Sequence, residues 1–337
     1  MPTPRQELLL RLVIEDYLDD GVPVGSKHLA ESVEWGPSTV RAELAVLEDE
    51  GLLAHPHTSA GRVPTDAGYR YFVDRLLPAA PIPEGRGLAL TLARREVDEA
   101  MRVTSETLSE VTDLLAMVSS PPLETSTIRH VEVLPLQPRV LMVVVITSTG
   151  GVTKRVFAFD EPVDPGLADW ASSYLNERLV GLGLGARMLH GRLHDPTLGA
   201  AEQGFLDTLA PAFTALEATA GDTLYVEGAA RLLAEERMQD LSEINSVMEV
   251  LERRVTLLGI LRASLGERDV VVRIGSENET PALRLLALVA ASYGLPQQRL
   301  GAVSVLGPVR MDYGHAIRSV REASVALSRF VEDVYET

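Results

Sequence analysis

The chain has 337 residues, of which 46% are hydrophobic and 23% charged, a globular balance that excludes a disordered or fibrous protein. This length predicts two or three domains, and the absence of cysteine excludes disulfides, thiol catalysis and Cys-ligated zinc. The net charge of −17 argues against a protein that coats nucleic acid regardless of sequence, because phosphate repels an acidic surface.

The first 78 residues predict short helices followed by a hairpin and another helix. Apolar periodicity marks the helices, and Gly and Pro separate them. The predicted elements are helices over residues 5–19, 26–33 and 38–50, extended pieces over 52–55 and 62–64, and a helix over 66–77. This order is the outline of a winged helix-turn-helix, so residues 1–78 are predicted to be a DNA-binding domain.

A stretch rich in Pro and Gly, residues 79–87, predicts a linker. Beyond it we expect a long helix over residues 88–118 with apolar residues at heptad spacing, and a second heptad pattern covers residues 241–258. Each pattern fits either a dimer interface or a helix that packs within its own domain.

The rest of the chain predicts strands, then a mainly helical block, then strands again. The strands are expected over residues 129–136, 140–147, 152–159, 223–226, 270–274 and 302–305, and helices over 164–178, 280–293 and 313–334. This order predicts an α+β multidomain protein: an α+β domain, residues 88–178 and 268–337, interrupted by an inserted helical domain, residues 179–267.

Residues 36–53 have the pattern of a helix that reads DNA. Ser38, Thr39 and Arg41 place donors at the positive N-terminal end of the predicted helix, and Ala42 is small enough for close approach to a groove. Acidic residues gather at the other end. An ordinary surface helix fits this run equally well.

The following stretch favours DNA binding. No acidic residue occurs between residues 51 and 65, and the turn combines hydroxyl, imidazole and guanidinium groups, which contact phosphate and the minor groove. The predicted DNA contacts are Lys27, Ser38, Thr39, Arg41, His57, Thr58, Ser59, Arg62 and Arg70. Lys27 and Arg70 are expected to contact phosphate. His55 and His57 are two residues apart and have no further metal ligands near them, so they are expected to be loop residues and not a metal site.

Other motifs do not support catalysis. The glycines at 181, 183 and 185 lack the strand and acidic residue of a dinucleotide site, and His190 and His194 lack the Glu of a zinc-protease helix. We expect no enzymatic activity, no cofactor and no metal. Without a signal segment or an apolar run of membrane-spanning length, we expect a cytoplasmic protein with no membrane association.

The run PHTSAGRVPTDAGYRY, residues 56–71, resembles the signature of the HrcA family of bacterial heat-inducible transcription repressors. Further similar motifs are PVGSK at 23–27, STVR at 38–41, VEG at 226–228, IGSEN at 274–278 and GPVRMDY at 307–313. The resemblance therefore extends over nearly the whole chain.

This resemblance implies a homodimeric repressor that binds an inverted-repeat operator, CIRCE, upstream of chaperone operons. It also implies that the GroE chaperonin maintains the DNA-binding form and that heat stress lowers repression. The family fold is a winged helix, a GAF-like domain and a dimerising domain inserted into it. One departure is Ala42, where the family commonly has Asn, which puts in doubt how one operator position is read.

Two other functions stay open at this stage. One is a regulator that senses a small molecule through its GAF-like domain. The other is an enzyme fused to a DNA-binding module, as in bifunctional biotin ligases, although the sequence lacks a glycine loop that would cradle phosphate.

Overall fold

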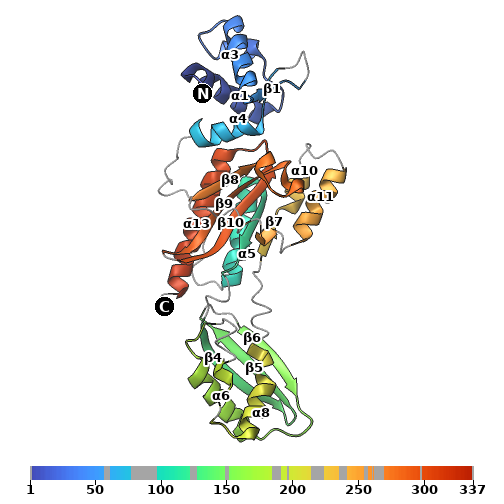
Figure 1. Ribbon diagram of the computed structural model, residues 1–337, viewed down its shortest axis with the longest axis vertical. Coiled ribbons are helices and arrows are strands. Elements are labelled where there is room, and N and C mark those ends of the chain that lie inside the picture. Colours follow the sequence, from blue (N-terminus) through green and yellow to red (C-terminus); the bar gives the residue numbers. More distant parts are fainter. Residues whose placement is uncertain are drawn as a thin grey trace.

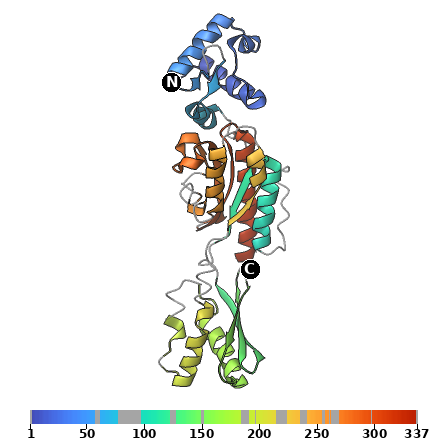
Figure 2. The same ribbon diagram turned by 90° about the vertical axis from the view of Figure 1, so that its right-hand side faces the viewer.

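The computed structural model describes residues 2–56, 61–76, 97–121, 127–148, 152–183, 191–195, 197–213, 224–234, 241–253, 257–259, 261, 269–296 and 298–335. These residues form an N-terminal, a central and a distal unit that follow one another along the longest axis of the molecule (Figures 1 and 2). Each unit contains both helices and a β-sheet, which confirms the expected α+β multidomain class.

The N-terminal unit, residues 2–76, has the expected order of elements. A helix that begins after a Thr3 capping box is followed by two shorter helices, an antiparallel two-stranded hairpin and a fourth helix. The elements are α1 (Pro4–Asp20), α2 (Ser26–Glu31), α3 (Pro37–Asp49), β1 (Leu53–Ala54), β2 (Val63–Pro64), α4 (Asp66–Tyr71) and the π-helical turn Phe72–Leu76. Their apolar faces meet in one core.

The central unit is built on a five-stranded antiparallel sheet in the order β7-β3-β10-β9-β8. Helices α5 and α13 cover one face, and α10 and α11 lie on the other (Figure 2). The elements are α5 (Val97–Thr112), β3 (Leu115–Ser119), β7 (Leu224–Glu227), α10 (Ala229–Ala234), α11 (Leu241–Glu252), β8 (Val270–Ile274), β9 (Leu286–Leu295), β10 (Gln298–Pro308) and α13 (Tyr313–Tyr335).

One predicted helix of this unit is wrong, and another ends earlier than expected. The helix expected over residues 280–293 is mostly strand β9, whose first six residues are all buried because helices cover both sheet faces. The helix expected to run to residue 118 ends at Thr112, and Asp113 adopts a left-handed φ of 55° that turns the chain into β3. Residues 88–96 lie outside the described residues.

The heptad patterns pack inside the protein. Val97, Met101 and Leu108 on α5 share a core with Val320 and Leu327 of α13. On the opposite sheet face, the described apolar residues of α11 join the core beneath β3 and β9. The intramolecular alternative therefore accounts for the burial of these residues, whereas Val111, the last residue of the first pattern on α5, is 47% exposed.

The distal unit has its own sheet and its own core. Its three strands pair only with one another, in the order β4-β5-β6, and a separate group of buried residues lies between this sheet and two helices. The elements are β4 (Ile128–Gln137), β5 (Val140–Thr147), β6 (Val152–Ala158), α6 (Pro165–Leu179) and α8 (Ala200–Leu209). The three strands and the helix expected over residues 164–178 are thus confirmed.

This grouping differs from the expected domain boundaries. The described residues between 128 and 213, not a segment over 179–267, leave the central sheet as a separate unit. The described part of residues 224–261 returns to the central sheet through β7 and the apolar residues of α10 and α11. The sequence does not predict this grouping, because the pattern that marks a segment as a strand does not reveal which sheet the strand joins.

Candidate nucleic-acid interface

Helix α3 presents a polar face at its N-terminal end. Gly36 is its N-cap, Pro37 occupies the first turn, and this turn contains no acidic residue and no side-chain cap. Val40, Leu44 and Leu47 are buried against the rest of the N-terminal unit.

The opposite face of α3 points to solvent. Ser38, Thr39 and Arg41 are exposed together with Ala42, so the structure brings the three predicted contacts of this helix onto one surface. Lys27, on the neighbouring α2, is exposed as well. Donors at the positive end of a helix are suited to a phosphate backbone or to base edges.

The acidic end of α3 is tied to the hairpin. Arg62 places Nη2 2.9 Å from a carboxylate oxygen of Glu48 and Nη1 3.1 Å from Nδ1 of His55. The Arg62 backbone also exchanges two hydrogen bonds with Val24. Its side chain is only 14% exposed, so Arg62 holds the hairpin against α3 and the segment before α2, and presents little surface to a ligand.

The remaining predicted contacts have different outcomes. His57, Thr58 and Ser59 lie outside the described residues. Arg70 faces the central unit: its Nε donates to Glu277 at 2.7 Å, and its Nη2 donates to the Val272 carbonyl at 2.6 Å. An arginine held by these groups is not available to phosphate, so the prediction for Arg70 is wrong for this arrangement.

The described residues contain no side-chain cluster suited to a metal ion. Among them, no group of three or more histidine and carboxylate side chains lies close enough together to hold a metal ion. None of the helices in this part of the chain combines the length and apolar character needed to cross a membrane.

The heat-inducible transcription repressor HrcA of Frankia casuarinae is 36% identical, over 97% of this chain and 96% of its own length. The HrcA of Thermobifida fusca is 35% identical, over 98% and 96% respectively. This chain is therefore a member of the class of transcription repressors.

A family model described as "HrcA protein C terminal domain" matches residues 98–317. The chain belongs to the HrcA family. A crystal structure of a hypothetical protein has a TM-score of 0.72 to this chain at 22% identity, covering 99% of this chain and all of its own, which shows that the fold is shared.

Proposed function

We propose that residues 2–76 form a winged helix-turn-helix that binds DNA through α3, and that the protein represses chaperone operons by binding the inverted-repeat CIRCE operator. The observation that carries this proposal is the exposed face of α3, with Ser38, Thr39 and Arg41 opposite a buried apolar stripe. A recognition helix needs this arrangement because its N-terminal residues contact base edges while its other face packs on the domain.

The strongly acidic composition is compatible with this role. Two of the three acidic residues of α3 lie at its C-terminal end, where Glu48 is paired with Arg62, and the N-terminal turn carries none. The third, Glu43, lies in the middle of the helix and accepts a hydrogen bond from the Gln6 side chain at 2.8 Å. Affinity is then confined to a small surface, and non-specific binding, which depends on the count of phosphate contacts, is weak.

A second copy of the chain completes the proposed repressor, because an inverted repeat is read by two-fold related helices. The support is the open face of the distal sheet. Alternate residues of β5, from Val140 to Ile146, lie on this face and are half-buried, while α6 and α8 cover the other face. The flanking strands add exposed apolar residues to it: Leu134, Leu136, Val152 and Val156.

This open face is complementary to itself. Across the strands, Glu132 pairs with Val144 and Val144 with Lys154, so the acid and the base lie on either side of β5 at one level. A two-fold axis along β5 would place each Glu132 opposite the Lys154 of the other copy and each Leu134 opposite a Val156. Apolar rows with such charge pairing are typical of a specific dimer contact.

The support for a proposal on how repression is regulated is the resemblance of the sequence motifs to the HrcA family. We propose that the central unit is the GAF-like domain of the family, and that the GroE chaperonin maintains the operator-binding form until heat diverts it to unfolded proteins. A repressor acts where the chromosome lies, so the proposal places the protein in the cytoplasm.

The test is a fluorescence-anisotropy titration of a labelled inverted-repeat duplex against a scrambled duplex of the same composition. The wild-type protein should prefer the inverted repeat, and Arg41→Ala should weaken this preference. Arg284→Ala is the matched control, because Arg284 is exposed on the central unit. A second titration, after heating with and without chaperonin, tests the regulation: equal recovery of binding in both samples would refute the chaperonin requirement.

A further inference from the structure

Three sequence motifs that are far apart in the chain meet at one contact between the N-terminal and central units. Asp66, Tyr69 and Arg70 come from the motif that begins in the hairpin, Ser276 and Glu277 follow β8, and Arg310 and Tyr313 precede or begin α13. We infer that these residues form a latch that fixes the orientation of the DNA-binding unit on the central unit, and through it the spacing of the two recognition helices in the dimer.

The polar part of the latch is a fork-to-fork ion pair. Arg70 donates through Nε and Nη2 to the two carboxylate oxygens of Glu277 and also pairs with Asp74 at 3.2 Å. The side chains of Arg70 and Glu277 are only 24% and 34% exposed, and such bidentate geometry is directional as well as strong.

Glu277 is itself held in place. Its carboxylate accepts the Ile274 N–H at 2.9 Å, which fixes the short turn after β8. Although burial raises the pKa of this carboxyl, the Arg70 guanidinium and the Ile274 N–H outweigh it and hold the pKa below the ordinary value. Glu277 is therefore charged at neutral pH and ready to pair.

A second polar contact requires a glycine. Asp66, at the start of α4, accepts a hydrogen bond from the Ser276 N–H at 2.8 Å. A Cβ on Gly275 would lie 2.3 Å from the Asp66 carboxylate, and Gly275 has a φ of 52°. Any side chain at Gly275 would push α4 away from this turn.

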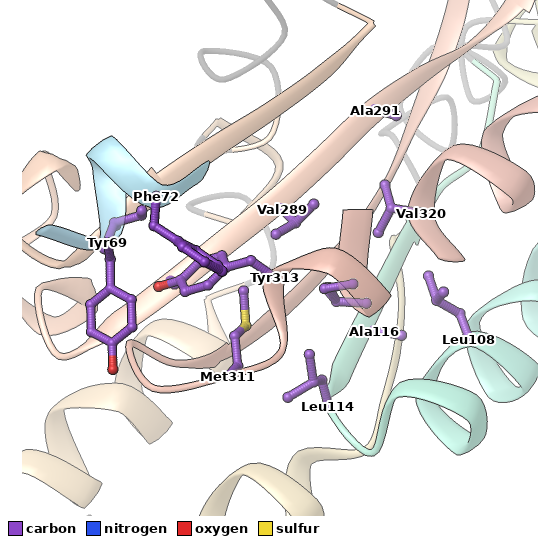
Figure 3. Close-up of a cluster of buried hydrophobic side chains, with 14 of the residues drawn as sticks. Tyr69, Phe72, Leu108, Leu114, Ala116, Val289, Ala291, Met311, Tyr313 and Val320 are labelled. Carbon is purple, nitrogen blue, oxygen red and sulfur yellow. The ribbon is translucent and has the colours of Figure 1, made fainter. Parts of the chain in front are cut away.

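The apolar part of the latch joins the two units into one core. The Tyr69 and Tyr313 rings lie with centroids 5.6 Å apart, and both rings are buried. Figure 3 shows Tyr69 and Phe72 beside Tyr313 and Met311, next to residues of the central sheet. Buried aromatic pairs of this kind restrict rotation of one unit on the other.

A third point of contact lies at the end of α1. The Arg310 guanidinium stacks over the Tyr17 ring at 5.6 Å, and it passes so close to Gly21 that a Cβ there would lie 1.7 Å from Nη1. Contacts at α1 and at both ends of α4 therefore hold the N-terminal unit at three separate points, as a fixed orientation requires.

This inference rests on the proposed function, because orientation matters only when two linked DNA-binding units bind two half-sites. If the latch is open, each unit still reads its half-site, but the second binding event loses the benefit of a preset geometry. Through the latch, a conformational change in the central unit would alter the orientation of the DNA-binding unit, although the central unit makes no contact with the DNA-binding surface itself.

The experiment reverses the charges of the ion pair in the full-length protein. The variants are Arg70→Glu, Glu277→Arg and the double variant that restores the pair in the opposite sense. Arg75→Glu is the control, since Arg75 is exposed near the end of the same unit. Gly275→Ala is a further variant that opens the latch by steric conflict with no change in charge.

Binding is measured to a full inverted repeat and to a single half-site, and thermal unfolding is followed by calorimetry. Each single variant should weaken full-site binding by roughly tenfold, leave half-site binding unchanged, and separate the unfolding of the N-terminal unit from that of the central unit. The double variant should restore both properties.

The inference is overturned if Glu277→Arg, Arg70→Glu and Gly275→Ala all behave like Arg75→Glu. It is also overturned if Arg70→Glu weakens half-site binding and Glu277→Arg has no effect, because Arg70 would then contact DNA directly. Failure of the wild-type protein to prefer the inverted repeat would instead contradict the proposed function, and the unfolding data would still decide whether the latch exists.

Discussion

Glu48, in the last turn of α3, forms a 2.9 Å ion pair with Arg62 at the start of the hairpin's second strand. The pair joins the C-terminal end of the proposed recognition helix to the hairpin that follows it. His55 is part of the same cluster, at 3.1 Å from Arg62. The hairpin and α3 are therefore positioned as one piece.

Arg62→Ala should lower the free energy of unfolding by about 1–3 kcal/mol, because the partly buried Glu48 carboxylate loses its 2.9 Å contact with the guanidinium and keeps only the more distant His55, at 3.9 Å. The measurement is urea unfolding, with operator affinity measured separately at low temperature, where the variant is still folded. Arg75→Ala, an exposed arginine of the same unit, is the control. Unchanged unfolding together with lost operator affinity would instead make Arg62 a direct DNA contact.

Arg41 and Lys27 should behave differently when each is replaced by alanine. Arg41→Ala should cost about 1–3 kcal/mol of operator binding and relax the preference at one base pair, if its guanidinium reads a guanine edge. Lys27→Ala should weaken all duplexes alike and lower the slope of log affinity against log salt by about one. Titrations of operator variants at several salt concentrations separate the two, and equal effects of both variants on every duplex would contradict base reading by Arg41.

The N-terminal unit was predictable because its signals are local. The Gly–Pro start of α3 and the apolar spacing of Val40, Leu44 and Leu47 fix the helix and its buried face without reference to the rest of the chain. The exposed Ser38 and Arg41 follow directly from that spacing. The proposed reading surface on α3 therefore depended on short-range patterns alone.

The errors arose where distant parts of the chain decide the structure. Strand β9 is covered by α5 and α13 on one face of the sheet and by α10 and α11 on the other, so its apolar run lacks the alternation of a half-exposed strand. Arg70 lies close in sequence to the hairpin, yet its partner Glu277 is more than two hundred residues away. The sequence predicted that Arg70 contacts a DNA phosphate, and only the tertiary structure shows that it binds the carboxylate of Glu277.

The open face of the distal sheet can be tested by a single charge. Val156 is 57% exposed and aligns with Met142 across the strands, so Val156→Lys would place an ammonium group inside the proposed contact. The dimer dissociation constant should rise at least about tenfold, because the charge loses water without gaining a partner. Sedimentation equilibrium measures it. Leu285→Lys, on the 43% exposed Leu285 of the central unit, is the control, and equal behaviour of the two variants would exclude this face as the dimer contact.

Asp195 gives the distal unit a defined sensitivity to acid. Its carboxylate accepts hydrogen bonds from the Thr197 hydroxyl at 2.6 Å, the Thr197 N–H at 2.9 Å and the Tyr174 hydroxyl at 2.9 Å. These bonds, with the nearby Arg178 guanidinium, lower the pKa of Asp195 from 3.8 to about 2. Because the folded state has the lower pKa, the stabilisation is complete above the unfolded value and is lost as the pH falls through the folded one.

Asp195→Asn should therefore be less stable than the wild-type protein at neutral pH, and the difference in melting temperature should shrink as the pH falls from about 4 to about 2. Thermal melts across this range measure the difference. The control is Asp160→Asn, because Asp160 is an exposed aspartate of the same unit. If the difference between wild type and Asp195→Asn stayed constant with pH, the Thr197 and Tyr174 hydrogen bonds would not depend on the charge of Asp195.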